Sequence, residues 1–316
     1  MFSRTLLQKF LIFLSVAPLL FISPSVAEEK GIEMEVETAA EQLLFTTIRI
    51  EVENPDKDGK TLKGVGTGFI VQYDWDNKSG FFLVTNKHVV KNAKKGRFFF
   101  IRGFEGKPLL GETYNIEISD FEKAWFFHPN ENIDVAVMPL VGIFEKIGQN
   151  KGSIFFKSIN QSLVPTAEQE QELDAIEEIV FVGYPNGIFD TTNHIPVFRK
   201  GITATPFRIN YSGMPKFLID GSIFPGSSGS PVFIFNKGSF SRRDGGLRVG
   251  NRLLFLGLIS EGYLRNEEGK WNFVEIPTVL VPAIYVPQMI NLGIVIKSSL
   301  VFETIRSLLR AKGEIK

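Results

Sequence analysis

The chain has 316 residues, a formal net charge of zero at neutral pH, and 44% hydrophobic residues. This length and apolar content suffice to bury a core in one large β domain or in two smaller lobes. A neutral balance argues against a nucleic-acid partner, because such a protein needs a basic face to replace the counterions around phosphates. Phenylalanine is frequent, with 30 residues, and aromatic side chains favour half-buried β structure.

Cysteine is missing from the whole sequence. This excludes thiol catalysis, cysteine-ligated zinc, lipid attachment at cysteine and disulfide bonds. We therefore expect the fold to depend on its hydrophobic core, and we predict no cofactor or metal.

Residues 1–27 have the pattern of an export signal. Arg4 and Lys9 give a positive start, residues 10–23 are mostly apolar, and residues 25–27 (Ser-Val-Ala) offer a small-x-small cleavage pattern. The apolar stretch is shorter than the roughly 20 residues that a membrane-spanning helix needs. We expect an exported bacterial protein, periplasmic or secreted, with no stable membrane insertion after cleavage. An uncleaved membrane anchor is the alternative.

The rest of the chain is dominated by short β patterns. Residues 28–44 are expected to form a short amphipathic helix or a loose extension, and residues 74–80 a hairpin loop. Many short strands with little helix between them indicate a barrel or a sandwich. The predicted strands are residues 44–51, 66–73, 81–85, 98–103, 133–140, 179–183, 197–203, 217–220, 231–235 and 253–259.

Three segments interrupt the β pattern. The acidic residues 163–178 predict a short helix that links two lobes, or an ordinary solvated connection. Residues 236–252, rich in Gly, Ser and Arg, predict a mobile surface loop. From Pro287 an apolar stripe predicts a largely helical tail that docks on the domain, with residues 296–316 as the terminal helical segment.

One segment combines a serine with small neighbours. Residues 224–232 have the sequence Phe-Pro-Gly-Ser-Ser-Gly-Ser-Pro-Val, with Ser228 at the centre. A serine hydroxyl is a weak nucleophile unless a base lies beside it, and acyl transfer also needs amide donors for the developing oxyanion. Glycines allow the tight turn that exposes such amides. Ser228 is the candidate nucleophile, and Gly226 and Ser228 are the candidate backbone donors, although this short motif alone also fits a polar loop.

The search for a base is limited to three histidines. His88 follows a predicted strand, whereas His128 and His194 stand in turn-like settings that are typical of surface or turn-stabilising histidines. Asp134 stands at the start of an apolar run, where an unpaired carboxylate is costly. It therefore needs a partner, which can be a histidine, a lysine or a turn amide.

Chain order discriminates among the known serine-hydrolase plans. An α/β-hydrolase needs a histidine after its nucleophile, and none follows Ser228. A subtilisin-like plan needs an aspartate before the histidine, and Asp74 or Asp76 serves only if the hairpin loop is catalytic. The order His88, Asp134, Ser228 fits the chymotrypsin plan.

Together, these motifs resemble the trypsin-like peptidases over about residues 45–295, and most closely the bacterial, disulfide-free branch that includes HtrA proteases and glutamyl endopeptidases. The segments that carry the resemblance are residues 64–70, 83–90, 134–137, 182–187 and 226–231. The resemblance implies an all-β fold of two antiparallel six-stranded β-barrels. The first barrel, about residues 45–160, would carry His88 and Asp134, and the second, about residues 177–285, would carry Ser228.

The resemblance also implies substrate-binding positions. Residues 257–262 are similar to the strand that pairs with the substrate backbone, where an extended peptide gains main-chain hydrogen bonds. Ser260, Glu261 and Gly262 belong to this set, and Ser260 is also implied to bond Asp134. Ser222 would lie at the base of the primary specificity pocket, and its lack of charge leaves a strict preference for Arg or Lys unsupported. Glu261 either favours a basic residue further along the peptide or is a solvated charge.

The sequence departs from the family pattern in three places. Ser227 stands where the digestive enzymes carry an aspartate that captures a new N-terminus, so that form of zymogen control is not expected. No PDZ-like domain fits after residue 295, and the pocket region lacks the additional histidine of glutamyl endopeptidases.

We therefore predict a serine endopeptidase that hydrolyses polypeptides through an acyl-enzyme on Ser228. A catalytically silent peptide- or protein-binding module on the same fold is the first alternative. An esterase that acts on small molecules is the second.

Overall fold

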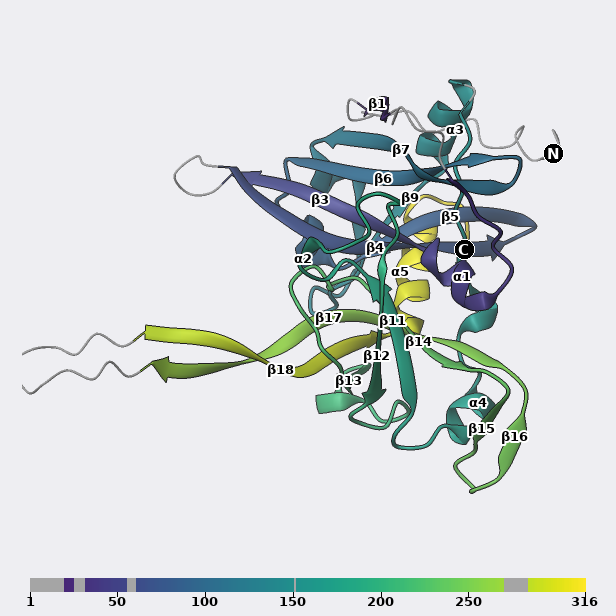
Figure 1. Ribbon diagram of the computed structural model, residues 1–316, viewed down its shortest axis with the longest axis vertical. Coiled ribbons are helices and arrows are strands. Elements are labelled where there is room, and N and C mark those ends of the chain that lie inside the picture. Colours follow the sequence, from purple (N-terminus) through teal and green to yellow (C-terminus); the bar gives the residue numbers. More distant parts are fainter. Residues whose placement is uncertain (1–19, 26–31, 56–60, 151, 270–283) are drawn as a thin grey trace, which may run out of the picture.

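The computed structural model describes residues 20–25, 32–55, 61–150, 152–269 and 284–316. The strands of the first half form one large sheet, and those of the second half form a closed barrel (Figure 1). A mostly β architecture with a C-terminal helix is confirmed.

The first half is a ten-stranded sheet. Its main path has the order β1-β7-β6-β3-β4-β5-β9-β8, with β2 paired to β7 and β10 paired to β4. The predicted hairpin at residues 74–80 is present, and its turn contains Asp76 and Asn77 with φ of 43° and 59°. The strands are β1 (Leu20–Ser25), β2 (Ile32–Glu33), β3 (Thr47–Pro55), β4 (Thr61–Trp75), β5 (Lys78–Thr85), β6 (Lys95–Phe104), β7 (Lys107–Ser119), β8 (Phe126–Phe127), β9 (Ala136–Pro139) and β10 (Ile159–Asn160).

The second half closes into the barrel β11-β12-β13-β18-β17-β14. A six-stranded antiparallel barrel is therefore confirmed for this half. For the first half a closed six-stranded barrel is not confirmed, because β1 and β2 extend the sheet beyond β7 and the two-residue β8 ends its other edge. The barrel strands are β11 (Glu178–Gly183), β12 (Val197–Thr203), β13 (Lys216–Asp220), β14 (Pro231–Asn236), β17 (Arg252–Gly269) and β18 (Ile284–Lys297).

Capping boxes define two of the short helices. Thr38 accepts from the Glu41 amide and begins α1, and Thr166 accepts from the Gln169 amide and begins α4, which is the short helix expected in residues 163–178. The helices are α1 (Ala39–Leu44), α2 (Lys87–Val90), α3 (Val141–Gln149), α4 (Ala167–Glu172) and α5 (Ser298–Ala311), with 3₁₀ turns η2 (Phe121–Ala124), η3 (Gln161–Leu163), η4 (Pro185–Gly187) and η5 (Tyr211–Gly213).

The prediction of a largely helical tail from Pro287 is wrong over its first part. Residues 287–297 belong to β18, and the helix begins at Ser298. Ile294 and Ile296 pair with Leu218 and Lys216 of β13. The two isoleucines are two residues apart, which suits a strand. The helical prediction extended over them because the apolar run continues without a break into α5.

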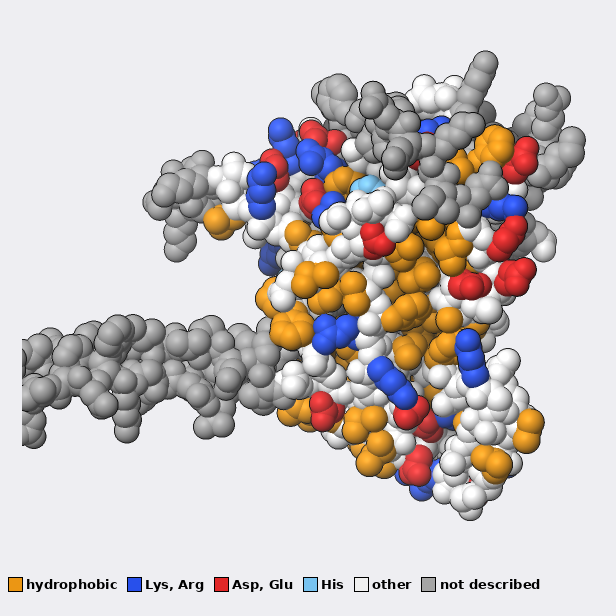
Figure 2. Space-filling view, in the orientation of Figure 1, with side chains coloured by type: hydrophobic (Ala, Val, Ile, Leu, Met, Phe, Trp, Pro, Cys, Tyr) orange, Lys and Arg blue, Asp and Glu red, His pale blue; other side chains and the backbone are white. Residues whose placement is uncertain are grey.

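The segment 236–252, expected to be a mobile loop, contains the hairpin β15 (Ser239–Ser241) and β16 (Leu247–Val249). The Glu172 carboxylate of α4 lies 3.2 Å from Arg242 and 3.4 Å from Arg248, so ion pairs hold the hairpin to the helix. The hairpin still lies at the surface. Figure 2 shows hydrophobic side chains on it at the lower right, in keeping with Leu247 and Val249, which are 70% and 84% exposed.

The strands β17 and β18 are longer than the barrel requires. Their pairing continues from Gly257 opposite Lys297 as far as Gly269 opposite Ile284. The far part leaves the body of the molecule as a two-stranded arm (Figure 1). The strand predicted at residues 253–259 is therefore only the first part of β17.

One hydrophobic cluster joins the two halves. It contains Tyr73 and Trp75 of β4, Phe233 of β14 and Phe255 of β17, together with the buried face of α5. The α5 helix therefore packs on the junction, as expected for a docked C-terminal helix. No helix in the described ranges combines the length and hydropathy that a membrane span needs.

The predicted signal segment lies mostly outside the described residues. Of residues 1–27, only 20–25 are described, as the strand β1 paired with β7. Cleavage of this segment stays a prediction.

Candidate active site

His88 lies at the end of a buried strand. The strand β5 ends at the buried Thr85, and the buried Asn86 leads from it into the four-residue helix α2. Val89 and Val90 are buried on one side of this helix, which turns the His88 side chain outward, where it is 48% exposed. Burial of the valines thus fixes the position of an accessible imidazole.

Asp134 precedes β9 and lies beside His88. Its Oδ2 is 2.6 Å from His88 Nδ1, and its Oδ1 accepts the His88 backbone N–H at 2.9 Å. The Ser260 hydroxyl donates to the same carboxylate at 2.7 Å, and the Asn86 side-chain amide donates to the Asp134 carbonyl at 2.9 Å. The carboxylate predicted to need a partner therefore has partners from two distant parts of the chain.

These contacts act on the charge of Asp134. Burial acts to raise the pKa of its carboxyl, but the hydrogen bond and charge of His88 and the hydroxyl of Ser260 outweigh burial, and the pKa is lowered below its ordinary value. Asp134 is therefore a stable anion at neutral pH. A negative charge beside Nδ1 favours the tautomer that carries its proton on that nitrogen and leaves Nε2 as an acceptor.

Ser228 lies on the turn between β13 and β14, next to β17. Its hydroxyl donates to the Ser260 carbonyl at 3.4 Å. Gly229 N–H donates to the Ile259 carbonyl at 2.8 Å, and Ile259 N–H donates to the Ser230 carbonyl at 3.0 Å, so the turn is attached to β17 next to this contact. Ser260 connects the serine to the histidine: its carbonyl accepts the Ser228 hydroxyl, and its own hydroxyl donates to Asp134, which bonds the His88 ring. In the described part of the chain, the Ser228 hydroxyl and the His88 ring are not hydrogen-bonded to each other.

Two amides of this turn have no protein acceptor among the described residues. These are the N–H groups of Gly226, which is buried, and of Ser228. Buried amides are normally paired, so free donors here are available to an oxygen that a ligand brings. Gly226 has φ of 88°, which favours glycine, and a Cβ on it would lie 2.4 Å from the Tyr184 carbonyl.

Thr67 of β4 holds the serine turn from the first half of the molecule. Its N–H donates to the Ser228 carbonyl at 2.9 Å, and its hydroxyl donates to the Gly226 carbonyl at 2.9 Å. The same hydroxyl accepts the Tyr184 N–H at 3.2 Å, and the Thr67 carbonyl accepts the Thr85 hydroxyl at 2.7 Å. Thr67 lies within one of the segments that resemble the trypsin-like peptidases, but its sequence context indicates no such role. Its bonds to Tyr184, Gly226 and Ser228 each span more than 100 residues of chain, and no local pattern signals them.

The predicted substrate-binding residues differ in their surroundings. Ser260 is buried and its hydroxyl is committed to Asp134, so only its main chain faces Ser228. Glu261 and Gly262 are exposed, and Ser222 is half-buried. Beyond the Ile259 contacts, the edge of β17 towards the Ser228 turn pairs with no described strand.

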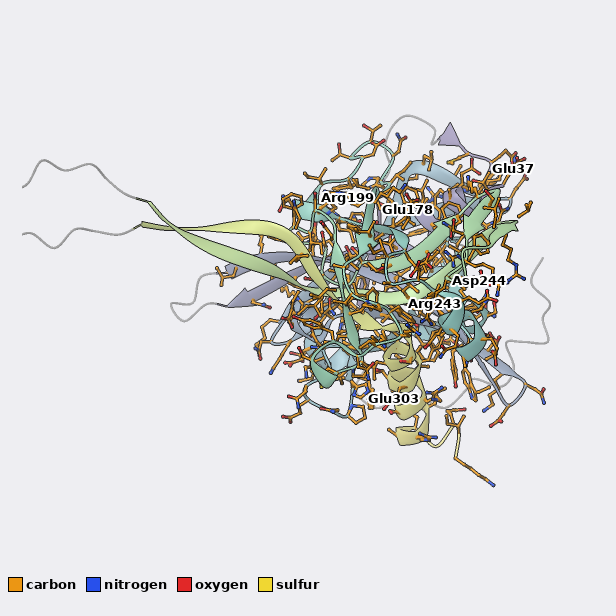
Figure 3. The ribbon with its side chains drawn as sticks, turned by 90° about the horizontal axis from the view of Figure 1, so that it is seen from below. Glu37, Glu178, Arg199, Arg243, Asp244 and Glu303 are labelled. Carbon is orange, nitrogen blue, oxygen red and sulfur yellow. The ribbon has the colours of Figure 1, made fainter. Side chains whose placement is uncertain are left out.

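The other two histidines lie apart from this cluster. His128 is buried; its Nδ1 accepts the Asn130 N–H at 3.0 Å, and its Nε2 lies 3.6 Å from Glu303, which Figure 3 shows on α5. His194 stacks near Phe189, with ring centroids 5.9 Å apart. Neither histidine contacts Ser228 or Asp134 within the described ranges.

A family model described as a trypsin-like peptidase domain matches residues 66–240, more than half of the chain. The chain belongs to this family. The matched part includes His88, Asp134 and Ser228, and Ser260 lies beyond it.

Two solved structures resemble the chain at low identity. The HtrA-type protease AlgW, determined with a tripeptide, is 14% identical with a TM-score of 0.45, and the match covers 87% of this chain and 63% of AlgW. Deg5 is 13% identical with a TM-score of 0.38, and the match covers 70% of this chain and 81% of Deg5. The chain thus spans less than two thirds of the length of AlgW. No curated protein matches the sequence.

Proposed function

We propose that this trypsin-like peptidase is a serine endopeptidase with Ser228 as nucleophile, His88 as general base and Asp134 as the residue that orients His88. One observation carries the proposal. The Asp134 carboxylate is hydrogen-bonded to the His88 imidazole, the His88 amide and the Ser260 hydroxyl. The Ser260 carbonyl in turn accepts a hydrogen bond from the Ser228 hydroxyl.

The proposed reaction begins when Ser228 turns about its Cα–Cβ bond from the Ser260 carbonyl to His88 Nε2. The imidazole takes the hydroxyl proton as the oxygen attacks the peptide carbonyl, and Asp134 stabilises the imidazolium that results. The Gly226 and Ser228 amides then hold the oxyanion. His88 returns the proton to the leaving amine, and water, activated by His88, releases the acyl-enzyme.

Polypeptide is the proposed substrate because one strand edge beside Ser228 is open. The β17 segment from Ser260 to Gly262 has no strand partner on that edge among the described residues. An extended peptide that adds to this edge gains main-chain hydrogen bonds, which do not depend on its side chains. We assign Ser222, Glu261 and Gly262 to this peptide site by their nearness in sequence to Ser228 and Ser260.

The proposal includes the finer organisation of the chain. Residues 45–295 would form the peptidase domain with the site between two chymotrypsin-type lobes, and residues 296–316 its helical tail. Residues 28–44 would be an N-terminal extension. Residues 1–27 would be the export signal, which leads to a periplasmic or secreted protein.

Cleavage of a diverse peptide library by the purified chain tests the activity. The wild type is expected to cut internal peptide bonds, and Ser228→Ala and Asp134→Asn to lower turnover by about a millionfold and roughly ten-thousandfold, as in model serine proteases. Ser239→Ala, at an exposed position of the hairpin β15–β16 outside the proposed site, is expected to keep turnover. Full cleavage by Ser228→Ala would contradict the assignment of the nucleophile.

A peptide-binding module without turnover is the second candidate. It is favoured by the Ser228 hydroxyl, which bonds the Ser260 carbonyl in place of His88. In that case the wild type would bind unfolded polypeptide and leave it intact, with the same affinity as Ser228→Ala.

A further inference from the structure

The turn that carries Gly226 is supported from outside by the segment between β11 and β12, residues 184–196. The Asn186 N–H donates to the Pro225 carbonyl at 2.5 Å. The Cα of Gly226 lies so close to the Tyr184 carbonyl that no Cβ could be placed between them. The main chain of residues 184–186 therefore sets where the Gly226 amide can point.

This segment is in turn held by an arginine of the first half. The Arg49 guanidinium of β3 lies between two rings, 4.4 Å from the centroid of Phe99 and 4.1 Å from that of Phe189. Its side chain is only 15% exposed, and it forms an ion pair with Glu51 at 2.8 Å. A planar guanidinium can stack on both rings while it keeps this ion pair, which a lysine ammonium cannot do.

Phe189, which stacks on Arg49, also contacts the ring of Tyr184. Their ring centroids are 6.1 Å apart in an edge arrangement, and the buried Tyr184 hydroxyl donates to the Thr47 carbonyl at 3.5 Å. Burial raises the pKa of Tyr184 to about 12, so the phenol stays a neutral donor. The path from Arg49 to Gly226 is thus made of direct contacts at every step.

A small pocket of about 20 Å³, open to solvent, lies between this segment and the first half and is lined by Phe99, Tyr184 and His194 among others. Phe99 lines this pocket and also contacts the Arg49 guanidinium, so the Arg49 stack lies next to the pocket.

We propose that Arg49 is a positioning residue for the oxyanion-binding amide of Gly226. The inference rests on the proposed serine peptidase function. By clamping Phe189 against Phe99, Arg49 fixes residues 184–186, and these residues hold Pro225 and Gly226 in the turn that leaves the Gly226 amide free.

The test compares Arg49→Met and Arg49→Lys with a matched control, Arg102→Met. Arg102 of β6 lies 5.5 Å from the Tyr114 ring centroid and pairs with Glu112, so the control also removes a stacked, ion-paired arginine. Arg49→Met is expected to lower kcat by roughly tenfold or more with little change in KM, because a displaced oxyanion donor weakens binding of the transition state only. Arg49→Lys is expected to recover little, and Arg102→Met to keep the wild-type kcat.

A peptide boronate, whose oxygen occupies the oxyanion position, gives a second readout. Arg49→Met is expected to weaken boronate inhibition, while the double variant with Ser228→Ala binds substrate peptide as well as Ser228→Ala alone. A folded Arg49→Met protein with wild-type kcat and wild-type boronate inhibition would overturn the proposal. So would an equal loss of kcat in Arg102→Met, since that would indicate general destabilisation.

Amide hydrogen exchange separates this inference from the proposed function. Exchange over residues 222–230 is expected to be faster in Arg49→Met than in the wild type or Arg102→Met, whether or not the protein cleaves peptides. Faster exchange without any peptidase activity in the wild type would sink the function and leave the support by Arg49 standing. Unchanged exchange over residues 222–230 in Arg49→Met, together with peptidase activity in the wild type, would contradict the role of Arg49 and leave the proposed function standing.

Discussion

At the scale of single residues, Thr67 of the first half makes several of the hydrogen bonds that hold the serine turn of the second half. The side chain is fully buried, and its hydroxyl serves the Gly226 carbonyl and the Tyr184 amide at once. A valine of the same shape would fill the space and leave both main-chain groups without a partner.

Thr67→Val is therefore expected to destabilise the folded protein by about 2–4 kcal/mol, since each buried group that loses its partner costs roughly 1–3 kcal/mol. Urea unfolding measures this free energy. Thr61→Val, at an exposed position of the same strand, is the control and should change it little. An equal effect of both substitutions would show that the hydroxyl of Thr67 has no special part.

His194 contributes to the pH dependence of the stability of the fold. Burial lowers the pKa of His194 from its ordinary 6.5; the charge of Arg49 lowers it further, and Asp190 opposes the shift. The unfolded chain then binds a proton at a higher pH than the folded chain. The stability linked to His194 is present above about pH 6.5 and is lost as pH falls from there through the folded pKa.

His194→Asn is expected to reduce this loss of stability. Asparagine tolerates the φ of 59° at this position better than most residues do. Urea unfolding at about pH 8 and pH 5 measures the difference. If the variant loses as much stability on acidification as the wild type, the pH dependence comes from other groups.

At the scale of elements, the sequence predicted those features that local patterns encode. Alternating apolar runs predicted the strands around the site, and the strand before His88 separated it from the two histidines in turn-like settings. The segment around β18 was misassigned because Ile294 and Ile296 precede the apolar stripe of α5 without a break, so the helical period was extended too far.

Long-range features could not be predicted in this way. The position of Arg49 between two rings depends on strands and a loop that meet only in the fold. The same holds for the arm, because two strands that continue beyond the barrel have no signature other than their own pairing. Glycine, serine and arginine are typical of loops, so the composition of residues 236–252 predicts a loop where the hairpin β15–β16 lies. The ion pairs that hold this hairpin are made with Glu172, which lies in a different part of the sequence.

At the scale of the whole molecule, α5 connects the two halves. Phe302 is 2% exposed, and its ring centroid lies 6.2 Å from that of Tyr73 of β4. The same cluster contains Phe233 and Leu258 of the barrel. Loss of the Phe302 ring would leave a cavity between the sheet and the barrel.

Phe302→Ala is expected to lower the free energy of unfolding by about 3–5 kcal/mol, in a single transition that both halves share. The test follows denaturation by tryptophan fluorescence, with Trp271 replaced by phenylalanine so that the signal comes from Trp75 and Trp125 of the first half, and by peptidase activity. Leu247→Ala, at a position 70% exposed, should stay within about 0.5 kcal/mol of the wild type. Two separate transitions in the wild type would show that α5 couples the halves less than its packing indicates.

The central claim is that the hydroxyl at 228 is activated by the imidazole at 88. Reaction with a fluorophosphonate, followed by peptide mapping in a mass spectrometer, tests it most directly. We predict one covalent adduct on Ser228 in the wild type, which forms far more slowly in His88→Ala and is absent from Ser228→Ala. An unlabelled wild type, or equal labelling of the wild type and His88→Ala, would contradict it.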